Sequence, residues 1–204
     1  MSARGKRAFH GVTQRTLGVA IVLGLLAWLM VSCRIAGVES EPAQAITAED
    51  LIIPESILPE GWEYATKPRP LGPSAGFGDE NDRKIAFRLS DDPDKPESLA
   101  GQYIFRLKDD KEAKYWYRWE VGVYFGQDLV RDLPLFPSQF TSNLRVGCKD
   151  IARSNHIQCV LLGQYDEFVV LLNAVIPEGY TTPEEFDAFA RRIDRFIGER
   201  LAQR

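Results

Sequence analysis

Hydrophobic and polar residues divide the chain into an apolar N-terminal stretch and a longer region of mixed periodicity. Residues 16–33 carry no charge, and they follow a leader that contains Arg4, Lys6, Arg7 and Arg15 but no acidic residue. A helix at the surface of a folded domain shows a polar stripe, which this stretch lacks. A basic leader before an apolar run is typical of a secretory signal or a membrane anchor. We therefore expect residues 1–33 to bring the chain to a membrane.

Alternating apolar and polar positions predict strands after residue 47. Between Gly101 and Leu107, Tyr103 and Phe105 alternate with Gln102 and Ile104, so the two sets face opposite sides of a strand. Further strands are expected at residues 62–64, 84–89, 144–148, 157–162 and 168–176. The last three form a predicted meander, with the turn between the final pair at residues 163–167.

Apolar residues spaced three and four apart predict two main helices. One covers residues 111–124, with Asp109 or Asp110 as its cap. The other begins at Thr182-Pro183-Glu184-Glu185, which combines a Thr cap, Pro at the first position and Glu at the third. Thr47 predicts a shorter turn, in which its hydroxyl accepts from a backbone donor three residues on. These elements indicate an α+β domain in which an antiparallel sheet of about five to six strands carries two helices.

The end of the apolar stretch reads Met30-Val31-Ser32-Cys33. It resembles the lipobox of bacterial lipoproteins, with Met30 where that family usually has Leu. The resemblance implies cleavage before Cys33 and acylation of Cys33. We expect residues 1–33 to be a lipoprotein-type signal peptide or a signal anchor. The Glu, Ser, Ala and Pro content of residues 34–46 indicates a flexible tether, and residues 47–204 are expected to form a single extracytoplasmic domain.

Two other fates of the leader are open. An uncut single-pass anchor fits the length of the apolar stretch, and its basic flank gives the same orientation. Cleavage at Ala43-Gln44-Ala45 would instead release the domain. In the first two cases we expect the protein at the cell membrane, lipid-anchored or single-pass, with its domain on the extracytoplasmic side.

The charge balance narrows the classes of partner. The leader holds four of the 25 basic residues and none of the 29 acidic ones, so residues 34–204 carry a net charge of −8. Nucleic-acid binding depends on clustered cations, which this domain lacks. We expect no nucleic-acid partner, and we expect membrane contact only through the N-terminus.

Two cysteines remain for the domain. Cys148 and Cys159 lie on neighbouring predicted strands, and an oxidising compartment favours a disulfide between them. Two buried free thiols are the alternative. A zinc site would have only His156 as a third ligand and no fourth.

Candidate chemistry is sparse. His156 has Asp150, Ser154 and Cys148 near it in sequence, but a disulfide would consume the thiol. Two acidic clusters lack the alternating ligand order of a calcium loop and are interpreted as solvated loops; they comprise Asp79, Glu80, Asn81 and Asp82, and Asp91, Asp92 and Asp94. We expect no catalytic residue, metal or cofactor.

The aromatic residues between 115 and 119 allow two interpretations. Tyr115, Trp116, Tyr117 and Trp119 could form a ligand cage, but aromatic packing of a helix onto a sheet is the favoured interpretation. The contact surfaces are instead expected on two polar loops, 67–82 and 90–98, including Phe77.

The leading hypothesis is a membrane-tethered binding or sensor-type domain that is not an enzyme, with a protein or small-molecule partner. One alternative is a structural or assembly subunit of an envelope complex. Another is a hydrolase, which would need a concave site in which carboxylates such as Glu120 or Asp166 have perturbed pKa values.

Overall fold

The structure is a computed structural model that describes residues 45–72, 81–89, 99–126, 131–133, 136–141 and 143–204. The chain divides into two units, Met1–Gln44 and Ala45–Arg204, and only the second is described. The lipobox-like segment, most of the tether, Phe77 and the cluster from Asp91 to Asp94 lie outside the described residues. Within the described residues, no helix has both the length and the apolar character needed to span a bilayer.

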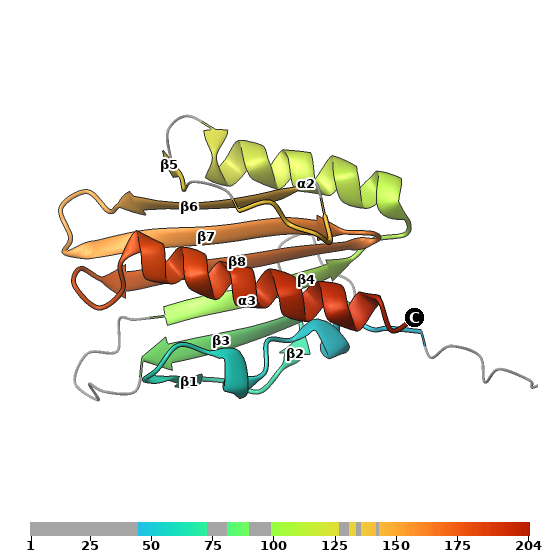
Figure 1. The fold of residues 1–204 in the computed structure, drawn as a ribbon, viewed down its shortest axis with the longest axis horizontal. Helices are drawn as coiled ribbons and strands as arrows, with labels where there is room; N and C mark the ends of the chain where they lie inside the picture. The colour runs from blue at the N-terminus through green and yellow to red at the C-terminus, as the bar shows by residue number, and fades with distance from the viewer. Residues whose placement is uncertain (1–44, 73–80, 90–98, 127–130, 134–135, 142) are drawn as a thin grey trace, which may run out of the picture. The chain divides into compact units, whose positions relative to one another are not determined.

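The described residues form one antiparallel sheet of eight strands (Figure 1). Its order is β1-β3-β4-β8-β7-β6-β5, and β2 pairs with β3 beside this path. The strands are β1 Trp62–Tyr64, β2 Arg69–Pro70, β3 Arg83–Leu89, β4 Leu99–Arg106, β5 Arg131–Asp132, β6 Leu144–Asp150, β7 His156–Tyr165 and β8 Phe168–Pro177. The predicted α+β class and antiparallel sheet are confirmed, and β2 and β5 are two-residue additions to the predicted strands.

One strand end differs from the prediction. β7 continues through Gly163, Gln164 and Tyr165, so only Asp166 and Glu167 form the turn to β8. The ring of Tyr165 lies over Gly163, where a Cβ would come within 2.6 Å of the ring. The polar and glycine residues that suggested a turn therefore belong to a buried strand, because the absent Cβ makes room for an aromatic ring.

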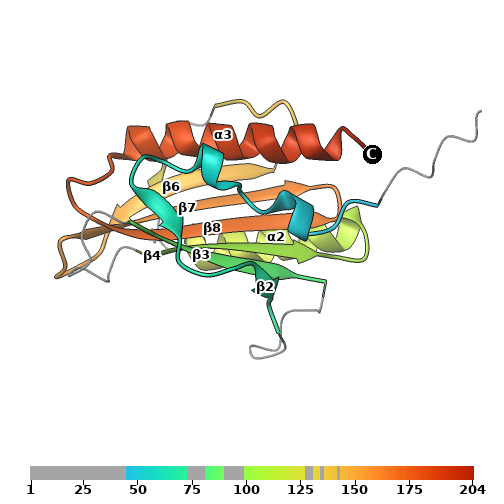
Figure 2. The same cartoon turned by 90° about the horizontal axis from the view of Figure 1, so that it is seen from below.

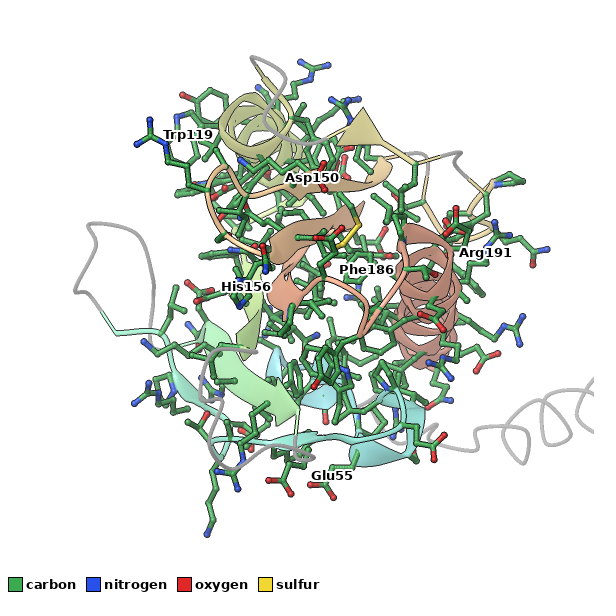
Figure 3. The ribbon with its side chains drawn as sticks, turned by 90° about the vertical axis from the view of Figure 1, so that its left-hand side faces the viewer. Glu55, Trp119, Asp150, His156, Phe186 and Arg191 are labelled. Carbon is green, nitrogen blue, oxygen red and sulfur yellow. A yellow bond between two sulfur atoms is a disulfide. The ribbon has the colours of Figure 1, made fainter. Side chains whose placement is uncertain are left out.

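The two helices cover opposite faces of the sheet (Figure 2). These are α2, Asp110–Tyr124, and α3, Pro183–Leu201. A strand with both faces covered is apolar throughout rather than alternating, which explains the nearly continuous apolar run of β8. In Figure 3, Phe186 lies between α3 and the sheet, whereas Trp119 is on α2 at the other face.

The larger core lies on the α3 side. Apolar residues of β6, β7 and β8 pack there against Phe186, Phe189, Ile193 and Ile197 of α3. The N-terminal segment, with the 3-10 turns η1 Glu49–Leu51 and η2 Glu55–Ile57, completes this face.

A buried glutamine holds that N-terminal segment to the sheet. The side chain of Gln102 accepts from the backbone N–H of Ile53 at 2.9 Å and donates to the carbonyl of Leu51 at 3.0 Å. One amide thus replaces the strand pairing that the segment would otherwise need. The predicted cap at Thr47 is wrong in its direction: the Thr47 hydroxyl donates to the carboxylate of Asp50 at 2.7 Å. This hydrogen bond lowers the pKa of Asp50.

Both main helices begin where their caps were predicted. The carboxylate of Asp109 accepts from the N–H of Glu112 at 2.8 Å at the start of α2. At the start of α3, Thr182 and Glu185 form a reciprocal capping box, followed by Pro183. Each cap satisfies donors that the first helical turn leaves without partners.

The predicted disulfide is present. Cys148 and Cys159 are directly paired across β6 and β7, with their Cα atoms 4.1 Å apart. It crosses the sheet on the α3 side, where both residues are buried. The bond consumes the Cys148 thiol and leaves no cysteine for zinc in the described domain.

Candidate functional site

A groove lies on the α2 side of the sheet. Helix α2 packs mainly on β7 and β8 and reaches β4 through Trp116 and Phe105, so it leaves β3 uncovered. The space between the helix and these strands has a volume of about 380 Å³. Pockets of this size accommodate small organic ligands.

The floor of the groove is a row of side chains across three strands. Lys84 on β3 pairs with Tyr103 on β4, which in turn pairs with Leu171 on β8. Asn173 lies two residues further along β8, opposite Gly101. A Cβ on Gly101 would come within 3.0 Å of the Tyr103 ring, so this glycine allows the ring to lie flat against the sheet.

Aromatic residues of α2 form the wall. Trp116 stacks on Phe105 of β4 with ring centroids 5.9 Å apart, and Trp119 meets Trp116 edge to face at 5.6 Å. Trp119 is 46% exposed and stands at the rim of the groove. The packing interpretation of the aromatic cluster therefore holds for Trp116 and for the buried Tyr117. It does not hold for Trp119, which borders the groove.

Glu120 is the most unusual residue of the groove. Its side chain lines the cavity, yet the residue is only 7% exposed. Among the described residues it has neither a hydrogen bond nor an ion pair. Burial raises the pKa of Glu120 to about 6. The pKa of neighbouring Tyr124 is also raised, first by burial and then by the charge of Glu120.

Two polar groups from the floor complete the site. Lys84 lines the same groove as Glu120, and the two form no ion pair within 4.0 Å. The side-chain oxygen of Asn173 accepts from the Gln158 amide at 2.9 Å. The NH₂ group of Asn173 therefore remains as a donor at the groove. The site thus offers a carboxylate, an ammonium group and an amide donor among aromatic and aliphatic walls.

A second cavity, of about 440 Å³, lies on the α3 side between that helix and the N-terminal segment. The carboxylate of Glu185 in its lining accepts from Thr182 as part of the capping box. The guanidinium of Arg192 lies over the ring of Phe189, 5.6 Å from the ring centroid. Two of the three charged groups in the lining therefore have structural partners, and the third, Glu60, is exposed. This cavity is a weaker candidate.

The groups near His156 that were considered as candidate catalytic residues do not assemble into a site. The hydroxyl of Ser154 donates to the carbonyl of Ile151 at 3.2 Å, and Cys148 is in the disulfide. Asp150 and His156 are labelled at the β6–β7 hairpin in Figure 3, away from the groove lining. The structure therefore offers His156 no available thiol nucleophile.

The two carboxylates of the hydrolase hypothesis are also separate. Glu120 lies in the groove, whereas Asp166 is in the β7–β8 turn and forms an ion pair with Arg204 at 3.4 Å. The described lining of the groove contains no second carboxylate and no Ser, Thr, Cys or His. Glycoside hydrolysis by the usual mechanism needs a carboxylate pair, and acyl transfer needs a nucleophile.

One acidic cluster is partly structural. Asp82 was predicted to lie in a solvated loop, but it is only 4% exposed, and its carboxylate accepts from the backbone N–H of Arg106 at 2.8 Å. A local sequence pattern could not show this contact, because the donor is on another strand. No group of metal-ligating residues occurs among the described parts of the chain.

Comparison with protein-family models, with curated proteins and with solved structures gives no significant match for this chain. The assignment of function therefore depends on the geometry and chemistry of the groove.

Lys84 and Asn173 were not singled out from the sequence. A single polar residue within a strand does not by itself indicate a binding site, because such positions ordinarily face solvent. The sequence did contain a sign that Glu120 is buried. It follows Ala113 and Tyr117 at helical spacing, which places a carboxylate on the buried face of α2.

Proposed function

We propose that this protein is a membrane-tethered, extracytoplasmic binding domain without enzymatic activity, and that the groove beside α2 is its ligand site. The observation that carries the proposal is Glu120, a residue that is only 7% exposed, lines the groove and forms no hydrogen bond or ion pair with a described residue. Burial of an unpaired charge costs folding free energy, and perturbed carboxylates concentrate at functional sites. A bound ligand with a complementary group would supply the missing partner.

Aromatic walls and few polar groups support binding of a small molecule. Ligand sites are typically concave and mostly apolar, with a small number of polar groups that set orientation. The groove has this composition, and the donors and acceptors come from three different elements, β3, β8 and α2.

The site is tested by protein-observed NMR on the full chain in mild detergent, with a mixture of aromatic amines, aromatic acids, amino acids and sugars. We expect the indole N–H signals of Trp116 and Trp119 to shift, and that of Trp62 to stay unchanged. Hits that shift only Trp62, which borders the cavity beside α3, would contradict the assignment of the groove. So would the absence of any hit.

The anchor is a separate part of the proposal, and it is supported by the apolar leader and the lipobox-like segment. Mass spectrometry of the mature N-terminus is expected to show an acylated Cys33, and Cys33→Ala should abolish the modification. An unmodified chain that begins at Met1 and is recovered from the cytoplasm would contradict it.

One observation favours the alternative of an assembly subunit in an envelope complex. Tyr115, Trp119 and Val123 are exposed along α2, at 71%, 46% and 41%. Their spacing of four residues forms one stripe on the helix. Specific co-purification of another envelope protein that is lost with Tyr115→Ser would support this function.

A further inference from the structure

The charges of the groove indicate the class of ligand, if the proposed function is right. Glu120 and Lys84 line one cavity of about 380 Å³ without pairing with each other, and neither has an ion pair with another described residue. Two opposite charges that line one cavity gain free energy from direct contact when they can reach each other. Here they remain apart, with aromatic and aliphatic side chains between α2 and the sheet.

We propose that the groove binds a zwitterionic small molecule of the amino-acid class, with its ammonium group at Glu120, its carboxylate at Lys84 and Asn173, and an apolar side chain against the aromatic wall.

The Glu120 end is suited to an ammonium group. A carboxylate can accept several hydrogen bonds, but the Glu120 carboxylate accepts none from a described residue. Tyr103, Trp119 and Tyr124 line the same groove as Glu120. Their ring faces attract cations, so they add to the attraction of the carboxylate.

The Lys84 end is suited to an anion. Lys84 supplies a charged donor from β3, and the Asn173 NH₂ group supplies a neutral one from β8. β3 and β8 are separated by one strand, so their backbones lie roughly 10 Å apart. A carboxylate between these strands can accept from both side chains.

Other ligand classes fit less well. A simple organic cation would bring a like charge near Lys84, and a simple anion would do so near Glu120. A neutral sugar has hydroxyl groups on every side, whereas Phe105, Leu171 and Val123 give the groove extended apolar walls. A zwitterion with an apolar body matches both charges and the walls.

The test is isothermal titration calorimetry on the full chain in mild detergent with five probes, one of which is L-leucine, an amino acid with a smaller side chain. L-phenylalanine carries both charges, phenethylamine lacks the carboxylate, 3-phenylpropionate lacks the ammonium group, and D-glucose is neutral. We expect L-phenylalanine or, for a smaller side chain, L-leucine to bind about tenfold or more tightly than the singly charged probes and than glucose.

Variants of Glu120 and Lys84 test which charged group of the ligand each residue binds. Glu120→Gln should weaken amino-acid binding by about tenfold to a hundredfold while sparing 3-phenylpropionate, and Lys84→Gln should do the same while sparing phenethylamine. Glu199→Gln on α3 and Lys114→Gln on the outer side of α2 are matched controls, since both residues are exposed. Both should leave binding unchanged.

Each outcome decides the proposal. Equal binding of phenethylamine and L-phenylalanine, tighter binding of glucose, or no binding of either amino acid would overturn the zwitterion assignment. If the fragments still shift Trp116 and Trp119, the groove remains a ligand site for another class. If no fragment shifts them, the proposed function fails as well.

Discussion

At the scale of single residues, polar groups in the interior have two different roles. Gln102 and Asp82 are buried with their hydrogen bonds made, to Leu51 and Ile53 and to Arg106 respectively. Glu120 is buried with none to a described residue. Satisfied groups stabilise the fold, whereas an unsatisfied carboxylate costs stability. This contrast separates the residue assigned to binding from those assigned to folding.

Glu120→Gln should make the protein more stable at neutral and alkaline pH. The pKa of Glu120 is raised from 4.5 to about 6 in the folded state. Well below pH ~4.5 the carboxyl is protonated in both the folded and the unfolded state, and it does not affect stability. As pH rises from ~4.5 to ~6 the folded state loses stability relative to the unfolded chain, by less than about 2 kcal/mol because solvent in the groove screens part of the effect.

Chemical denaturation of wild type and Glu120→Gln at pH 4 and pH 8 measures this difference. The variant should match wild type at the acidic pH and exceed it at the alkaline one. Glu199→Gln, an exposed carboxylate on α3, should show no such dependence. Lys84, Tyr103 and Tyr124 also line the groove, and they are unchanged in both proteins. A variant that is less stable than wild type at pH 8 would show that Glu120 supports the fold.

At the scale of elements, local sequence accounts for the helices and their starts. The caps at Asp109 and Thr182 and the apolar spacing behind them were readable directly, because capping and amphipathicity are properties of neighbouring residues. The end of β7 was not, since Gly163 and Gln164 resemble turn residues. Only the Tyr165 ring above Gly163 explains why the strand continues.

Two helical glycines should respond oppositely to alanine. Gly122 on α2 has open space around it, so Gly122→Ala should stabilise by about 0.5–1 kcal/mol through helix propensity. On α3, a Cβ at Gly198 would overlap the ring of Phe140. Gly198→Ala should therefore destabilise by about 1–3 kcal/mol.

The loop before β6 makes relief of that clash costly. The Ser138 hydroxyl donates to Asp194 of α3 at 2.8 Å and accepts from the N–H of Phe140 at 3.1 Å. Phe140 is thus held on the helix from its backbone. Thermal unfolding of both alanine variants checks the pair, and a stabilised Gly198→Ala would show that Phe140 moves away freely.

At the scale of the whole molecule, a disulfide links two neighbouring strands of a sheet that is covered by a helix on each face. Cys148 and Cys159 are 11 residues apart in sequence. Closure of a loop of this length lowers the entropy of the unfolded chain and contributes roughly 2–3 kcal/mol.

Cys148→Ala combined with Cys159→Ala should lower the free energy of unfolding by that amount while preserving the fold, since the sheet buries a large apolar core without it. Denaturant titration of the variant, and of wild type with and without reductant, measures the change. Reductant should affect wild type and leave the variant unchanged. Equal stability of oxidised and reduced wild type would contradict a stabilising disulfide.

The sequence by itself determined the α+β class, the main strands and helices, both helix caps and the disulfide pair. These follow from periodicity and from contacts between residues near in the chain, so local physics is sufficient for them. Glu120 was also recognised as a carboxylate of interest, but without its surroundings.

Only the tertiary structure decided where the ligand site lies. The groove depends on β4 pairing with the distant β8 on the side away from β3, and on α2 covering β7 and β8 while leaving β3 open. This strand order and this helix position depend on contacts between residues far apart in the sequence, because both faces of the sheet must be buried together. The resulting fold brings Lys84, Asn173 and Glu120 to one cavity. The spacing of these residues along the sequence does not predict that they lie close together.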